Sequence, residues 1–217
     1  MMNFIKSRGF IYILAIGVGL AAFLAGQSLN DKKQATPVDL MRLKDGAVTQ
    51  SVGQPVIGGP FALTDHNGKA VTEKDYLGKY LMVYFGYTYC PDVCPTSMQT
   101  ILDAMDMVGD GAEKIVPMMI TIDPERDTPE VLKEFVTQFH PRMVGLTGSA
   151  DAIASAVRGY RVYRAKVEDE SVKGKDEDYL MDHTSITYFM GPDGKFIKHF
   201  PHGTPVDKMA ERIKSLM

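Results

Sequence analysis

Cys90 and Cys94 are the only two cysteines among the 217 residues of the chain, and they lie four positions apart. Two thiols can bind a soft metal ion, or they can exchange electrons as a dithiol–disulfide pair. They cannot build a scaffold of several disulfides, and alone they cannot supply a four-thiolate zinc site. A bond between them would close a very short loop, which removes little entropy from the unfolded chain. The pair is therefore interpreted as a chemical site and not as a structural cross-link.

The two cysteines lie between a predicted strand and a predicted helix. Residues 80–85 form a continuous apolar run of strand length, which is typical of a central buried strand. After the cysteines, apolar residues recur at helical spacing: Met98, Ile101, Leu102, Met105 and Val108. The amides at the start of such a helix lower the pKa of a nearby thiol. Because Pro95 disfavours helical geometry in the residue before it, we expect the helix to begin only at Pro95.

The rest of residues 53–217 alternates predicted strands with predicted helices. A hairpin is expected around residues 65–68, and a second one around the turn at 191–194. Further strands are expected at 115–122, 144–146, 161–166, 184–190 and 195–200, and further helices after Thr128, after Ser149 and over 205–217. Residues 168–178 contain six acids and are interpreted as a solvated loop. This order predicts one α/β sandwich domain with a mixed central sheet.

The first thirty residues have the pattern of a membrane anchor. Residues 10–26 are 17 residues without a charge, and a helix of that length spans ~25 Å, the short end of what crosses a bilayer. Cleavage after Ala25 would leave Phe23 three residues before the cut, where a cleaved signal needs a small residue. An uncleaved transmembrane helix is therefore favoured over a cleaved signal. The expected organisation is a head and signal anchor at 1–29, a polar tether at 30–52 and a soluble domain at 53–217.

The expected location and the net charge of the chain limit the classes of partner that it can bind. Positive residues lie on both sides of the apolar run, so the positive-inside count does not decide its orientation. The short head and the lack of a long Arg- and Ser-rich presequence favour the bacterial inner membrane, with the domain in the periplasm. The net charge is −3, and residues 1–30 carry +2, so residues 31–217 carry −5. An acidic domain without a basic stripe excludes nucleic acid as a main partner.

Three further motifs accompany the cysteine motif Cys-Pro-Asp-Val-Cys-Pro at residues 90–95. They are Ile-Asp-Pro-Glu-Arg-Asp-Thr-Pro at 122–129, Asp-His-Thr at 182–184 before an apolar run, and Gly-Pro-Asp-Gly at 191–194. In combination, these motifs resemble the Sco/SenC family over about three quarters of the chain. The resemblance implies a thioredoxin-like fold, a membrane-tethered domain outside the cytoplasm, and the handling of copper for the dinuclear copper site of cytochrome c oxidase. It also implies that Cys90, Cys94 and His183 are the metal ligands.

The chemistry of these residue types agrees with that implication. Copper(I) is soft and accepts low coordination numbers, so two thiolates and one imidazole suit it, whereas zinc would require a fourth ligand. Composition alone does not distinguish His183 from the other four histidines, which are interpreted as surface or capping residues: His66, His140, His199 and His202. His183 is expected to open a strand near the cysteine loop. The 14 methionines are interpreted mainly as core packing, and residues 123–129 as a helix start and loop brace.

Three functions stay open at the level of sequence. The first is a copper metallochaperone that binds one copper ion per chain and delivers it to the copper-site subunit of cytochrome c oxidase. The second is a thiol–disulfide reductase that keeps the cysteines of the oxidase copper site reduced. The third is a redox sensor that uses the same cysteine pair without a metal. Three residues between the cysteines, in place of the two of general oxidoreductases, argue against general oxidoreductase activity but not against a specialised reductase.

Overall fold

The structure, a computed structural model, describes residues 56–168 and 179–217. The residues from Gly53 to Met217 form one compact unit. The predicted anchor and tether, and the acidic segment 169–178, lie outside the described residues. Within the described ranges, every helix is too short or too polar to span a bilayer.

A seven-stranded mixed sheet lies at the centre of this unit, as the sequence predicts. Its strand order is β2-β1-β5-β4-β3-β8-β9. The strands are β1 (Ala62–Asp65), β2 (Ala70–Thr72), β3 (Tyr80–Gly86), β4 (Ile115–Thr121), β5 (Val144–Thr147), β8 (Ile186–Met190) and β9 (Phe196–Pro201). Strands β3, β4 and β5 are parallel to one another, and all other neighbours pair antiparallel. The two predicted hairpins are confirmed as β1–β2 and β8–β9.

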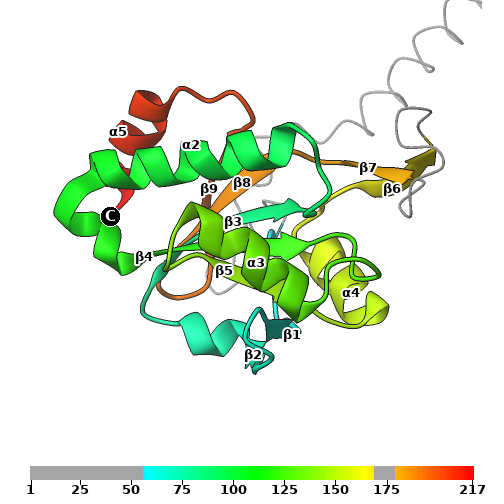
Figure 1. Cartoon of the computed structure of the whole chain (residues 1–217). Coiled ribbons are helices and arrows are strands. Elements are labelled where there is room, and N and C mark those ends of the chain that lie inside the picture. The colour runs from blue at the N-terminus through cyan, green and yellow to red at the C-terminus, as the bar shows by residue number, and fades with distance from the viewer. Residues whose placement is uncertain (1–55, 169–178) are drawn as a thin grey trace, which may run out of the picture. The chain divides into compact units, whose positions relative to one another are not determined.

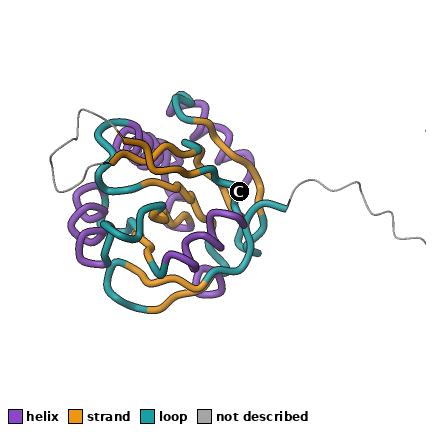
Figure 2. Tube along the Cα trace, turned by 90° about the vertical axis from the view of Figure 1, so that its right-hand side faces the viewer, coloured by secondary structure: helices purple, strands orange, loops and turns teal. Residues whose placement is uncertain are grey.

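In the part of the chain that the structure describes, four α-helices cover the two faces of the sheet (Figures 1 and 2). They are α2 (Val93–Val108), α3 (Pro129–Phe139), α4 (Ala150–Gly159) and α5 (Val206–Leu216). Helices α2 and α3 connect parallel strands that are added in the same direction, so right-handed crossovers place both on one face. Short 3₁₀ helices, η2 (Glu73–Tyr76) and η3 (Gly109–Lys114), follow β2 and α2. The predicted N-caps are confirmed, because Thr128 and Ser149 accept from the first-turn amides of α3 and α4.

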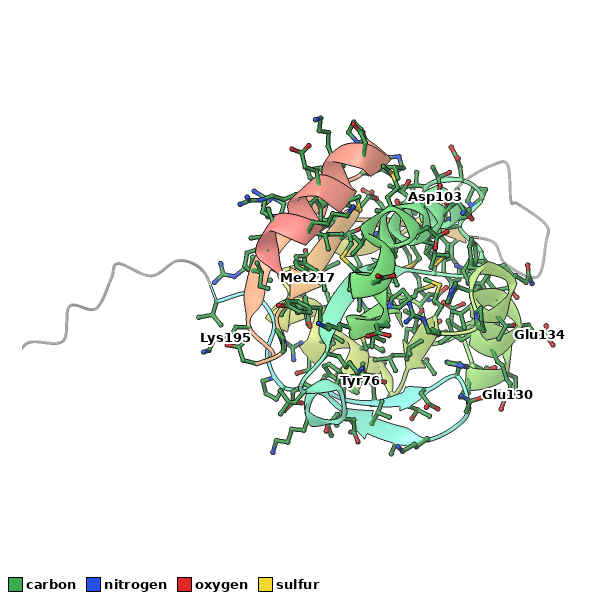
Figure 3. The ribbon with its side chains drawn as sticks, turned by 90° about the vertical axis from the view of Figure 1, so that its left-hand side faces the viewer. Tyr76, Asp103, Glu130, Glu134, Lys195 and Met217 are labelled. Carbon is green, nitrogen blue, oxygen red and sulfur yellow. The ribbon has the colours of Figure 1, made fainter. Side chains whose placement is uncertain are left out.

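The hydrophobic core lies between the sheet and these helices. From Leu81 to Gly86, every residue of β3 is buried, which explains its continuous apolar sequence. Four methionines at predicted core positions are buried, and their interpretation as packing is confirmed: Met98, Met105, Met118 and Met119. On α3, Leu132 and Val136 face the core, while Glu130 and Glu134 point away from it (Figure 3). This rigid sheet fixes the positions where β3 ends and α2 begins.

Two expectations about the segments that carry the candidate ligands are wrong. Helix α2 begins at Val93, not at Pro95. Pro95 occupies the first turn, where an amide has no partner within the helix, so its missing N–H costs nothing there. His183 does not open a strand. It is the last residue of β7 (Tyr179–His183), which pairs with β6 (Arg164–Glu168) in a separate two-stranded sheet.

Candidate metal centre

The cysteines lie where the buried strand β3 passes into helix α2. Cys90 is in the connecting loop and half-buried, and Cys94 is the second residue of α2 and fully buried. The loop fits closely because Gly86, the last residue of β3, has no side chain. A Cβ atom at Gly86 would lie 2.9 Å from the Cys94 sulfur and 2.9 Å from the Tyr84 ring. The sequence therefore allows Cys94 to approach the end of β3.

The two thiols are free and interact with each other. The backbone N–H of Cys94 donates to the Cys90 sulfur at 3.3 Å. The pKa of Cys90 is lowered because its sulfur accepts a hydrogen bond from the Cys94 thiol and another from this first-turn amide. The same bond between the two thiols, together with burial, raises the pKa of Cys94. The pair thus divides into an accessible thiolate, Cys90, and a buried thiol, Cys94.

His183 reaches the cysteines from the other sheet. Its Nε2 lies 3.5 Å from the Cys94 sulfur, and its Nδ1 lies 3.1 Å from the carbonyl oxygen of Thr184. A carbonyl oxygen only accepts, so this contact places the proton on Nδ1 and leaves the lone pair of Nε2 directed at the sulfurs. The rings of Tyr84 and Tyr87 lie edge-on to the imidazole, each with a centroid separation of 6.1 Å. The structure therefore brings the three predicted ligands together.

The donor set suits a soft metal ion, but its atoms are engaged with one another. Among the described residues, no three His, Cys, Asp or Glu side chains are placed to hold a metal ion together as they stand. The Cys94 sulfur accepts from the Tyr84 hydroxyl in the core at 3.8 Å. Metal binding would replace the contacts between the thiols and the imidazole by bonds to the ion. It would require the Cys90 and Cys94 side chains to rotate toward a common point.

An open cavity of about 400 Å³ lies beside these residues. Cys90 and His183 line it, together with Tyr87, Val93 and Met181. Its lining comes from the cysteine loop on one side and from β7 on the other. A group from outside the protein therefore has a route to Cys90 and His183.

The other histidines lie away from this cavity, as the sequence interpretation expects: His66, His140, His199 and His202. Nδ1 of His66 accepts from the backbone N–H of Gly145 at 3.1 Å, and Nδ1 of His202 lies 2.9 Å from the Ser97 hydroxyl. They have local structural partners. Tyr84 and Tyr87, whose rings contact the imidazole of His183, were not predicted as site residues. The only signal for Tyr84 was its hydroxyl in an otherwise apolar run, and Tyr87 lies outside that run.

The interpretation of residues 123–129 as a loop brace is confirmed. The buried Asp127 carboxylate accepts from the Thr88 hydroxyl at 2.6 Å and from the Thr121 hydroxyl at 2.5 Å. The backbone N–H of Thr88 donates to it as well. Burial raises the pKa of Asp127. Since Thr88 belongs to the segment between β3 and Cys90, Asp127 fixes the approach to the first cysteine.

Comparison with known proteins assigns the chain to a family. A sequence model described as SCO1/SenC matches residues 49–217. The chain belongs to the SCO1/SenC family. Among its SCO1/SenC relatives, the human mitochondrial SCO1 homolog is 39% identical over 198 residues, which cover 90% of this chain and 62% of that protein. The chain thus spans less than two thirds of the length of this relative.

Solved SCO1/SenC structures share the fold. Copper-bound ScoI of Arabidopsis thaliana is 42% identical, with a TM-score of 0.68 over 73% of this chain and 96% of that one. Copper-bound ScoI of Bradyrhizobium japonicum is 44% identical, with a TM-score of 0.66 over 74% and 99%. The expected thioredoxin-like α/β fold is confirmed. A further structural neighbour, BsSco, is described as a member of the Sco family of cytochrome c oxidase assembly proteins.

Proposed function

We propose that this protein is a copper metallochaperone in the assembly of cytochrome c oxidase. The observation that carries the proposal is the convergence of Cys90, Cys94 and His183 beside an open cavity in a SCO1/SenC chain. Copper-bound structures of relatives at 42% and 44% identity support copper as the cargo. Two thiolates and one imidazole match the preference of copper(I) for soft ligands and low coordination numbers.

The geometry suggests an order of events for binding. The Cys90 thiolate is half-exposed at the cavity and is the first donor that an incoming copper(I) ion meets. The ion then displaces the Cys94 thiol proton, and Cys94 turns from its contact with the Cys90 sulfur to the metal. Nε2 of His183 completes the set without losing a proton, because the ring carries its proton on Nδ1. Cargo leaves by the reverse path when a partner's sulfur enters through the cavity.

The recipient and the location are parts of the same proposal. We place delivery at the copper-site subunit of cytochrome c oxidase, with the domain in the periplasm and residues 1–29 anchoring it in a bacterial inner membrane. The uncharged run at 10–26 supports the anchor. The chain should then stay with the membrane pellet after alkaline carbonate washing, and protease should degrade it in spheroplasts with an intact inner membrane. Release by carbonate, or protection until lysis, would reject this placement.

Copper counting on the full chain tests the proposed cargo. The chain is loaded with copper(I) under reducing conditions, desalted, and its metal content measured for wild type and for His183→Ala. We expect close to one copper per wild-type chain and a sharp fall in the variant under chelator competition. The loaded chain should then transfer its copper to a reduced copper-site domain of an oxidase subunit. A wild-type chain that retains no copper would contradict the proposal.

A thiol–disulfide reductase is the second candidate, and the division of the cysteines into a thiolate and a buried thiol favours it. The Cys90 thiolate would attack a disulfide of the target and form a mixed disulfide. Cys94 would then displace the target's sulfur, leaving the target as a dithiol and this chain with a Cys90–Cys94 disulfide. Rapid reduction of a disulfide in a copper-site peptide, with no retention of copper, would favour this function over the first.

A further inference from the structure

The two segments that carry the candidate ligands belong to different sheets. The cysteines follow β3 of the central sheet, whereas His183 ends β7, which pairs only with β6 in the described residues. Figure 1 shows β6 and β7 projecting beyond the central sheet on the side where β3 ends and α2 begins. No strand ladder in the described residues joins the two sheets. The chain links β7 to β8 of the central sheet through Thr184 and Ser185. Beyond this link, side-chain contacts hold β7 against the cysteine loop.

Arg126, in the loop between β4 and α3, makes contacts with both segments. Its guanidinium lies over the rings of Tyr87 and Tyr89, at 5.7 and 4.9 Å from their centroids, and both belong to the loop before Cys90. It also lies 3.7 Å from the ring centroid of Tyr179, the first residue of β7, and its Nη1 donates to the Tyr179 carbonyl at 3.0 Å. One side chain thus touches the cysteine loop and the histidine strand.

The environment of Arg126 shows that these ring contacts matter. Its side chain is only 11% exposed, and its Nε donates to the buried Asp123 carboxylate. Its Nη2 is buried and has no hydrogen-bond partner, the one such side-chain atom among the described residues. A buried guanidinium nitrogen without an acceptor is costly unless something else stabilises the charge. Three aromatic rings around the same cation supply that stabilisation through cation–π contacts.

Further contacts connect the residues around Arg126 to His183, the proposed metal ligand. The Tyr179 hydroxyl donates to Asp123 at 2.9 Å, which ties the start of β7 to the same loop. In the middle of β7, the backbone N–H of Met181 donates to the Tyr87 hydroxyl at 3.2 Å. At the end of β7, the ring of Tyr87 lies against the imidazole of His183. The strand is therefore fastened at its start and its middle, two residues before the ligand.

We propose that Arg126 is a positioning residue that ties β7 to the cysteine loop and thereby holds His183 over the two sulfurs. The proposal rests on the metal site proposed above. Arg126 is an arginine because the role requires a planar cation that covers three rings and donates to a carboxylate and a carbonyl together. A lysine ammonium is a compact charge and cannot make these contacts at once. Loss of Arg126 should therefore act on copper through His183, with both cysteines intact.

A double-mutant cycle on the full chain tests this. Copper(I) affinity is measured by competition with a chromophoric chelator for wild type, Arg126→Ala, His183→Ala and the double variant. We expect Arg126→Ala to weaken binding about 10–100-fold, the usual effect of losing a partner that orients a ligand. The double variant should bind no more weakly than His183→Ala alone, because both changes remove the same ligand. Additive losses, or wild-type affinity in Arg126→Ala while His183→Ala is impaired, would overturn the proposal.

Amide hydrogen exchange in the apo chain separates positioning from general destabilisation. In Arg126→Ala, the Met181 amide should exchange faster while amides of β3 and α2 keep their wild-type protection. If Arg126→Ala does not fold, copper(I) affinity and amide exchange are measured on Arg126→Lys, which still pairs with Asp123. We expect weaker copper binding and faster exchange of the Met181 amide in this variant as well. Wild-type exchange at Met181 together with wild-type copper affinity in that variant would reject the proposal.

Lys166→Ala is the matched control. Lys166 also lies over the Tyr179 ring, at 4.3 Å from its centroid, but from the solvent side and paired with the exposed Glu125. Its removal should change copper affinity by less than about twofold, as expected for an exposed pair. A loss as large as that of Arg126→Ala would mean that any cation on this ring suffices, which contradicts the role assigned to Arg126. If His183→Ala itself leaves affinity unchanged, the metal site fails, and this proposal fails with it.

Discussion

The cysteine segment and the β6–β7 hairpin contribute to one site but are held in place by different means. The cysteines follow a fully buried strand and enter a helix packed on the central sheet, so backbone and core fix them. His183 ends a strand that pairs only with β6 in the described residues. Side chains of the β4–α3 loop hold the start of this strand, and a two-residue link joins its end to β8. Two of the predicted ligands thus lie on a segment fixed by the core, and the third lies on a strand held by local side-chain contacts.

The largest expected loss of copper affinity comes from a substitution in the cysteine segment. Cys94→Ala removes a sulfur that faces both Cys90 and His183. Copper(I) affinity should fall by more than about 100-fold. This loss is larger than the usual one for a residue that only orients a metal ligand. Chelator competition measures the affinity, with Gln99→Ala on the exposed side of the same helix as the control. If Cys94→Ala binds copper as tightly as the control, Cys94 is not a ligand.

Gly86→Ala tests whether the backbone positions the cysteines. The new methyl group would lie 2.9 Å from the Cys94 sulfur and from the Tyr84 ring. Since both neighbours are buried, we expect a loss of about 1–3 kcal/mol in the free energy of unfolding, with weaker copper binding because the sulfur is displaced. Urea denaturation and chelator competition on the same preparation measure both effects. An unchanged free energy of unfolding would show that the residues around Gly86 can move to make room for the methyl group, although they are buried.

The opposite pKa shifts of the two thiols predict selective alkylation in the apo chain. The pKa of Cys90 is lowered and that of Cys94 is raised, so only Cys90 carries thiolate in mildly acidic solution. At pH 6, iodoacetamide should modify Cys90 at least about tenfold faster than a free cysteine, whose pKa is about 8.5. Cys94 should stay unmodified in peptide mass spectra. Equal labelling of both cysteines would contradict the assignment.

Tyr87→Phe gives the smallest expected effect and tests the local attachment of the hairpin. The change removes only the hydroxyl that accepts from the Met181 amide. One such hydrogen bond contributes about 1 kcal/mol, so copper affinity should fall about fivefold at most while the fold remains. Faster exchange of the Met181 amide is the direct measurement. Unchanged exchange would show that the ring of Tyr87, and not its hydroxyl, holds β7.

The sequence predicts the cysteine segment well and the hairpin poorly, for a physical reason. An apolar run at 80–85 and apolar residues at helical spacing from Met98 report burial, which periodicity detects. Strand β7 has the sequence Tyr-Leu-Met-Asp-His, with only Met181 buried, so no alternation indicated it. His183 was singled out by the resemblance of its motif and not by any pattern of burial. The role of Arg126 depends on rings from residues 87, 89 and 179, which only the fold brings together.

X-ray absorption at the copper edge tests the central claim most directly. For the copper(I)-loaded full chain, we predict two sulfur ligands and one nitrogen ligand, and loss of the nitrogen with retention of both sulfurs in His183→Ala. This result would establish that the rigid cysteine segment and the locally attached hairpin share one metal ion. A first shell that is the same in wild type and His183→Ala would contradict the account, because His183 would then not be a ligand.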